Sequence, residues 1–235
     1  MSMKGQNMTI KLTDPYLKAQ MKAGLYHLRR FKQCLPEGSQ AFISGGFLRD
    51  LHHGFGCRDV DIFYWIPEDK ITTYYDTPMK KNVMSHLASF RRIKCIAEGD
   101  GGYDYDEHQG IQDIYEYTVN KGVLKYREVQ LIRLKCDPRY IIEDFPINMS
   151  RIYMGIDGVI HTTKEYDEGF KTKTIFECHG KQWNYLYLAK ILGRYSDYAF
   201  VPYNWKRNKD MAMIEQLLND LPDAKEKLFS DLANK

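Results

Sequence analysis

The stretch that decides the fold is AFISGGFLRDLHHGFGCRDVDIFYWI, which runs from Ala41 to Ile66. Its pattern predicts a short apolar strand, a Gly-Gly turn, a small helix and a second strand that carries two aspartates. Asp59 and Asp61 alternate with Val60 and Ile62. Because residues two apart on a strand share a face, we expect both carboxylates to point the same way while the apolar pair faces the core.

Two carboxylates held side by side repel each other unless a cation compensates them. A hard divalent ion with oxygen ligands, Mg²⁺ (or Mn²⁺), does this and leaves room for substrate phosphates. The Gly45-Gly46 turn offers backbone N–H groups ahead of Arg49 and Asp50, and such N–H groups at the start of a helix form an anion site. A phosphate turn close in sequence to metal-binding carboxylates suggests nucleotidyl transfer.

Each of these signals is weak when it stands alone. A lone DxD is often a solvated pair of turn aspartates, and a lone Gly-Gly is most often a turn that needs a positive φ. A second DxD, Asp104 with Asp106, lies in the Gly- and Asp-rich segment 98–110 and is interpreted as a solvated loop. The ordered set of strand, Gly-Gly turn, helix and DxD strand is the stronger indication.

The segment GGFLRDLHHGFGCRDVDIF, residues 45–63, resembles the signature of the polymerase-β-like nucleotidyltransferases. The resemblance is closest to the head domain of class II tRNA nucleotidyltransferases (CCA-adding) and bacterial poly(A) polymerases. EVQLIR, residues 128–133, resembles the family's EVxTxR strand, and DFPINMS, residues 144–150, resembles its RRDFTINA motif. A predicted strand pair over 152–160 follows, and the resemblance extends over about residues 38–165.

The resemblance implies a Mg²⁺-dependent nucleotidyltransferase that uses a nucleoside triphosphate such as ATP. Asp59 and Asp61 would hold the metal ions, and Glu128 would be the third catalytic carboxylate and metal ligand. Glu128 has an alternative reading as an exposed hairpin glutamate paired with Arg127 or Lys125.

The nucleotide-binding residues that the signature implies are Ser44, Gly45, Gly46, Arg49, Asp50, Asp144 and Asn148. Arg49 could instead form a structural ion pair with Asp50 or with a sheet carboxylate. Asp144 could cap a turn before Pro146. Asn148 lies on an apolar stretch, where a buried amide needs hydrogen-bond partners.

The chain also departs from the family pattern. Ile142 and Glu143 replace the paired arginines before DF, and no ExxR-type segment for choosing C or A is evident. The acceptor therefore stays open between an RNA 3′ end (tRNA-like), a protein and a small molecule. A nucleotide-binding regulator or pseudo-enzyme, and a structural or interaction protein using its 18 tyrosines, are the competing classes.

Composition sets broad bounds. The chain has 235 residues, 43% hydrophobic and 28% charged, which is ordinary for a soluble globular protein, and its net charge of +3 does not by itself indicate nucleic-acid binding. The five scattered cysteines, with no CxxC, indicate reduced thiols in a cytoplasmic protein. No apolar run is long enough for a membrane span, and we expect no signal peptide. The oligomeric state is not predicted.

The fold class expected is α/β (α+β), with a mixed, mostly antiparallel sheet backed by helices. We expect an N-terminal helical segment (1–37), a catalytic domain (38–165) and a small helical C-terminal region (166–235). Strands are predicted at 41–44, 59–65, 93–97, 111–119 and 124–134. Helices are predicted at 14–34, 47–53, 80–92, 138–143, 183–194, 209–218 and 223–232.

Overall fold

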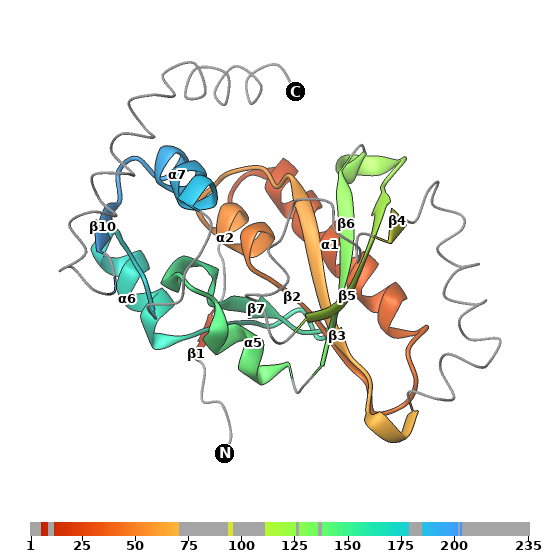
Figure 1. Cartoon of the computed structure of the whole chain (residues 1–235). Coiled ribbons are helices and arrows are strands. Elements are labelled where there is room, and N and C mark those ends of the chain that lie inside the picture. Colours follow the sequence, from red (N-terminus) through yellow and green to blue (C-terminus); the bar gives the residue numbers. More distant parts are fainter. Residues whose placement is uncertain are drawn as a thin grey trace.

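The computed structural model in Figure 1 describes residues 6–8, 12–70, 94–95, 111–125, 127–135, 138–178, 185–201 and 203. The predicted helices at 80–92, 209–218 and 223–232, and the second DxD, lie outside these residues. The helices described are α1 (Pro15–Lys32), α2 (Gly46–His52), α5 (Arg139–Asp144), α6 (Lys164–Thr172) and α7 (Tyr185–Arg194). Two 3-10 turns are η1 (Gly122–Leu124) and η2 (Asn148–Ser150).

An eight-stranded sheet runs through the middle of the molecule in the order β1-β8-β7-β2-β3-β6-β5-β4. Every neighbouring pair is antiparallel except β3 and β6, which are parallel. The predicted mixed, mostly antiparallel sheet is confirmed. Its strands are β1 (Gln6–Met8), β2 (Gln40–Ser44), β3 (Asp59–Trp65), β4 (Lys94–Cys95), β5 (Ile111–Thr118), β6 (Glu128–Leu134), β7 (Ile152–Met154) and β8 (Ile160–Thr162).

The start of α1 follows from local chemistry. The Asp14 carboxylate accepts hydrogen bonds from the backbone N–H groups of Tyr16 and Leu17 at 2.6 and 3.2 Å, and Pro15 occupies the first helical position. Both features are typical of helix N-termini. The Asp14 side chain satisfies N–H groups that have no partner within the helix, and Pro15 has no N–H group that would need one. The predicted start is therefore confirmed.

Helices cover both faces of the sheet. On one face, α1 and α2 pack against Val60, Ile62 and Tyr64 of β3 in the larger core. On the other face, α5 packs against Phe63 and Ile132. Asp59 and Asp61 share the α5 face with Phe63, because strand residues alternate between faces.

The C-terminal region differs from the expectation of helices alone. It also contains β9 (Thr174–Phe176) and β10 (Ala199–Val201), which form a separate parallel pair. The expected boundary at 165/166 falls inside α6, and α1 contributes to the main core. The strand predicted from residue 124 begins at Glu128, because Leu124 is instead buried in η1. Among the described helices, none is both long and apolar enough to cross a bilayer.

Candidate active site

Two neighbouring strands carry the three predicted catalytic carboxylates. The parallel register of β3 and β6 places Asp59 opposite Glu128 and Asp61 opposite Gln130. On the far side of β6, Gln130 lies opposite Glu116 of β5, and its Nε2 donates to Glu116 Oε2 at 3.0 Å. The sheet therefore brings four carboxylates together from segments that are far apart in sequence. They are Asp59, Asp61, Glu128 and Glu116, and they are called the acidic row below.

The two aspartates of β3 resist ionisation. Burial, followed by the repulsion from Asp59, raises the pKa of Asp61 well above its ordinary value. Burial, followed by the repulsion from Asp50, raises the pKa of Asp59. In both cases the positive charge of Arg49 acts in the opposite direction. Such a pair is unfavourable as two bare anions, so it favours a bound cation.

The donor atoms fit a hard divalent cation. Asp61 Oδ1 is buried and has no hydrogen-bond partner, although buried polar atoms normally have one. Among the described residues, no group of three or more His, Cys, Asp or Glu side chains is arranged to hold a metal. Two carboxylates with the remaining positions left to phosphates and water match the usual coordination of Mg²⁺.

Glu128 is exposed and lies beside this pair without completing a three-carboxylate metal group. Partial burial, then Glu116 and Asp59, raise the pKa of its carboxyl. The charged groups that shift this pKa are therefore acidic ones, as they would be at the edge of a cation site. The role of Glu128 as the third carboxylate stays a prediction.

The Gly-Gly turn lies against the aspartates. Gly45 has a φ of +74°, which favours glycine, and a Cβ at this position would lie 3.9 Å from Asp61 Oδ2. The Gly45 N–H donates to the Ile152 carbonyl at 3.4 Å, so this amide already has a partner. Gly46 is the first residue of α2, where a backbone N–H has no carbonyl within the helix to bind.

Arg49 and Asp50 form the buried ion pair that the sequence left as an alternative. Arg49 Nε lies 3.0 Å from Asp50 Oδ1, and both side chains are almost fully buried. Asp50 Oδ1 also accepts from the hydroxyl of Tyr195, and Asp50 Oδ2 pairs with Arg194 Nη1 at 3.1 Å. Both oxygens of Asp50 are thus engaged by protein groups, so its carboxylate joins α2 to the end of α7, and a contact between Asp50 and a nucleotide stays a prediction.

Two other predicted residues serve the fold. The Ser44 hydroxyl is buried and donates to the Ile152 carbonyl at 2.6 Å. Asn148 is fully buried; its Nδ2 donates to the carbonyls of Glu165 and Thr174, and its Oδ1 accepts from the Phe176 N–H. Asn148 therefore joins η2 to α6 and β9, and a contact between Asn148 and a nucleotide stays a prediction.

Asp144 is the last residue of α5 and is half-buried. The guanidinium of Arg151 donates to the carbonyls of Glu143 and Phe145 on either side of it. Arg151 was not among the predicted residues, since its partners are backbone atoms that no side-chain motif reveals. A contact between Asp144 and the ribose stays a prediction.

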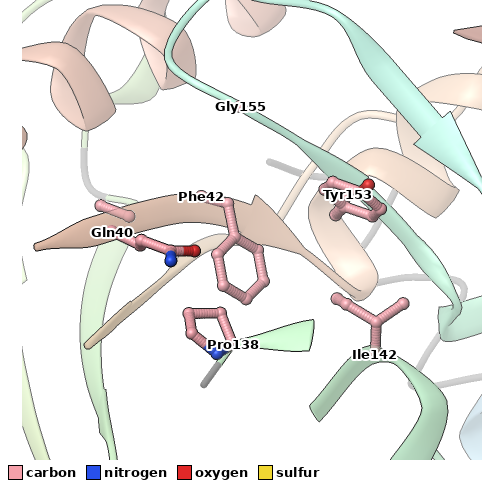
Figure 2. Close-up of a pocket in the computed structure, with 7 residues that line it drawn as sticks. Gln40, Phe42, Pro138, Ile142, Tyr153 and Gly155 are labelled. Carbon is pink, nitrogen blue, oxygen red and sulfur yellow. The ribbon is translucent and has the colours of Figure 1, made fainter. Parts of the chain in front are cut away.

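Figure 2 shows a pocket of about 230 Å³ toward the other end of the same sheet face. Phe42, Ile142, Tyr153 and Pro138 line most of it. Phe42 lies opposite Phe63, two residues along β3 from Asp61. The pocket is thus part of the apolar end of the face and is distinct from the acidic row.

Comparison with known proteins supports the fold. No protein-family model matches the sequence, and no curated protein is significantly similar to it. A solved CCA-adding enzyme with ATP gives a TM-score of 0.53 at 12% identity, over 90% of this chain and 44% of its own. The Thermotoga maritima CCA-adding enzyme with tRNA gives a TM-score of 0.52 at 11% identity, over 90% of this chain and 44% of that enzyme's chain. A tRNA-processing enzyme gives a TM-score of 0.51 at 11% identity, over 91% of this chain and 49% of that enzyme's chain.

These likenesses show that the chain shares the fold of these solved enzymes, which is the fold that the sequence resemblance implied. Identities of 11 and 12% establish the fold and nothing finer. The chain spans less than half of the length of these solved enzymes.

Proposed function

We propose that this chain is a Mg²⁺-dependent nucleotidyltransferase that moves a nucleoside monophosphate from a nucleoside triphosphate to a hydroxyl acceptor. The observation that carries the proposal is the pair Asp59 and Asp61, with a buried, unpartnered oxygen on Asp61 beside the Gly45 turn. Buried carboxylate oxygens normally accept a hydrogen bond from a protein group, and an oxygen without such a donor is available to a cation. The fold shared with CCA-adding enzymes adds support.

In the proposed reaction, the acceptor oxygen forms a bond to the α-phosphorus, the bond to pyrophosphate breaks, and the acceptor proton passes to a base. Asp59 and Asp61 would hold Mg²⁺, which when bound neutralises the triphosphate and lowers the pKa of the acceptor hydroxyl. Glu128 is the candidate that orients and deprotonates the acceptor, since it lies opposite Asp59 on β6. Gly46 would bind phosphate oxygens through its N–H, and Arg49 would add positive charge.

An RNA 3′ end, tRNA-like, is the acceptor that we propose first, because two of the structural relatives are a CCA-adding enzyme with tRNA and a tRNA-processing enzyme. A nucleotide-binding regulator on the same fold is the second candidate. The exposure of Glu128 is the observation that favours it.

The test offers each labelled nucleoside triphosphate separately, with Mg²⁺ or Mn²⁺, to the chain together with total RNA including tRNA. Label transferred to RNA by the unmodified chain, and lost in Asp61→Asn, supports the transferase. Metal-dependent nucleotide binding without transfer to RNA, protein or small molecules supports the regulator. If nucleotide binds equally well with and without divalent ion, the metal assignment and the proposal are both wrong.

A further inference from the structure

We propose that the end of α7 belongs to the nucleotide site, where its last residue Arg194 and Tyr195 directly after it position Arg49 against the phosphates of the bound nucleotide. This inference rests on the proposed function and deepens it. It assigns a role to a helix that begins beyond the part of the chain resembling the nucleotidyltransferase signature. Figure 1 shows α7 beside α2, the helix that follows the Gly-Gly turn.

The contact that joins the two helices is centred on one carboxylate. Asp50 Oδ1 accepts from Arg49 Nε at 3.0 Å and from the Tyr195 hydroxyl at 2.5 Å. The same hydroxyl accepts from Arg49 Nε at 3.1 Å, and the guanidinium carbon of Arg49 lies 5.6 Å from the centre of the Tyr195 ring. Tyr195 is 1% exposed, so this geometry is fixed by burial.

Arg194 shares Asp50 with Arg49. Its Nη1 lies 3.1 Å from Asp50 Oδ2, its Nη2 donates to the Gly56 carbonyl at 2.8 Å, and its guanidinium lies over the Phe55 ring. Two guanidinium groups therefore share one carboxylate, and Asp59 and Asp61 are the nearby acids on which the charge of Arg49 also acts. Buried charges are costly unless they are fully compensated, so once Asp59 and Asp61 hold a metal ion the two guanidinium groups favour an additional anion.

The orientation of Arg49 indicates where that anion would bind. Its Nη1 makes two long contacts, 3.4 Å to the Ser150 hydroxyl and 3.3 Å to the Tyr187 hydroxyl. Its Nη2 lies 3.4 Å from the position that a Cβ on Gly46 would occupy. The outer edge of the guanidinium therefore lies at the Gly-Gly turn, and a guanidinium edge is suited to binding phosphate oxygens.

If Arg194 is removed, Asp50 is left with Arg49 as its only cation in this cluster. The positive charge at the turn then falls, and Arg49 binds phosphate less well although its own side chain is unchanged. If the Tyr195 hydroxyl is removed, Asp50 and Arg49 lose the group that sets their mutual orientation. Tyr195 and Arg194 are in this sense positioning residues.

The experiment measures binding of inorganic tripolyphosphate with Mg²⁺ by calorimetry and records thermal melts of the same preparations of full chain. Tripolyphosphate is used because it requires no choice of base. The variants are Tyr195→Phe, Arg194→Gln and Arg194→Lys. Tyr198→Phe is the matched control. The Tyr198 hydroxyl bonds Nε2 of His53, the residue after α2, at 2.8 Å, so it joins the end of α2 to the segment after α7 through His53 and not through the side chain of Arg49 or Asp50.

We expect Tyr195→Phe to raise the dissociation constant roughly fivefold and Arg194→Gln roughly tenfold or more, the sizes of a neutral and a charge-assisted hydrogen bond. Arg194→Lys should recover only part of the loss, because it restores the charge but not the contacts of the planar guanidinium with the Gly56 carbonyl and the Phe55 ring. Tyr198→Phe should also lower the melting temperature, because it removes the hydrogen bond to His53, while leaving the dissociation constant unchanged.

A merely structural role for α7 predicts a different result. Tyr195→Phe and Tyr198→Phe would then change binding equally, or neither they nor Arg194→Gln would change it, and the positioning role would be overturned. If the unmodified chain binds neither tripolyphosphate nor ATP with Mg²⁺, the proposed function fails, and this inference fails with it.

Discussion

One face of the central sheet has two ends that differ in chemistry although the same strands form both. At one end, Phe63 and Ile132 are buried under α5. At the other end, two residues earlier on β3 and four earlier on β6, lie Asp61 and Glu128. The apolar end provides stability through burial, whereas the acidic end concentrates charges that destabilise the metal-free fold. Stability and the proposed function are therefore separated along single strands.

The largest effect that we expect is at the acidic end. Asp59→Ala and Asp61→Ala should each reduce nucleotidyl transfer by roughly 10³-fold or more, since the triphosphate loses its neutralising metal. Neither change should lower the melting temperature, because neither side chain belongs to the apolar core. Label incorporation is the measurement, and Asp69→Ala, at a largely exposed carboxylate, is the control. Near-normal turnover in either β3 variant would contradict the assignment of this strand.

Ile132→Ala tests the apolar end. Ile132 is 1% exposed, and the substitution should lower the free energy of unfolding by about 3 kcal/mol, through lost burial and the cavity that remains. Urea unfolding measures this change. Nucleotide affinity per folded molecule should be unaffected. A lower nucleotide affinity in a fully folded sample would show that the apolar end of the sheet face influences binding at the acidic end.

Glu128→Gln tests whether Glu128 has a different role from the two aspartates of the acidic end. We expect transfer to slow by about 10²-fold, the usual contribution of a positioned base. The affinity for triphosphate should stay nearly constant, because Glu128 would act on the acceptor and not on the donor. Single-turnover kinetics with separate binding measurements decide this, and unchanged turnover would point to Asp144 as the next candidate.

The smallest effect should be a gain in stability. Asp61→Asn should raise the free energy of unfolding of the metal-free protein by about 1 kcal/mol, the usual size of a single stabilising substitution. Burial and Asp59 raise the pKa of Asp61, so the folded state keeps a proton that the unfolded chain releases. The stability of the unmodified protein should therefore fall as pH rises from the ordinary carboxyl pKa toward the raised one.

Unfolding of both proteins across pH, without and with Mg²⁺, measures this difference. The free energy of unfolding should change less with pH in Asp61→Asn than in the unmodified protein, and Mg²⁺ should stabilise only the unmodified protein. A destabilised Asp61→Asn would mean that the carboxylate serves the fold.

Local patterns in the sequence predicted the parts of the site that local geometry determines. The strand that carries Asp59 and Asp61 has the predicted bounds, and α2 begins within one residue of the prediction. The roles of Asp50 and Asn148 could not be predicted, because their partners Tyr195 and Thr174 come from elements distant in sequence. Nothing in the residues around Tyr195 indicates which buried carboxylate it will meet. The β9 and β10 pair was missed because both strands are short.

The parallel pairing of β3 with β6 has a consequence for folding kinetics. Parallel neighbours cannot be joined by a tight hairpin, so the chain between Trp65 and Glu128 must first return to the other end of the sheet. Contacts across such a long closure form late, because the entropy lost in closing the chain precedes the gain from pairing. Asp59 and Asp61 are near each other as soon as β3 is extended, whereas Glu128 joins them only when that closure is complete. We therefore expect the acidic row to be among the last parts of the molecule to assemble.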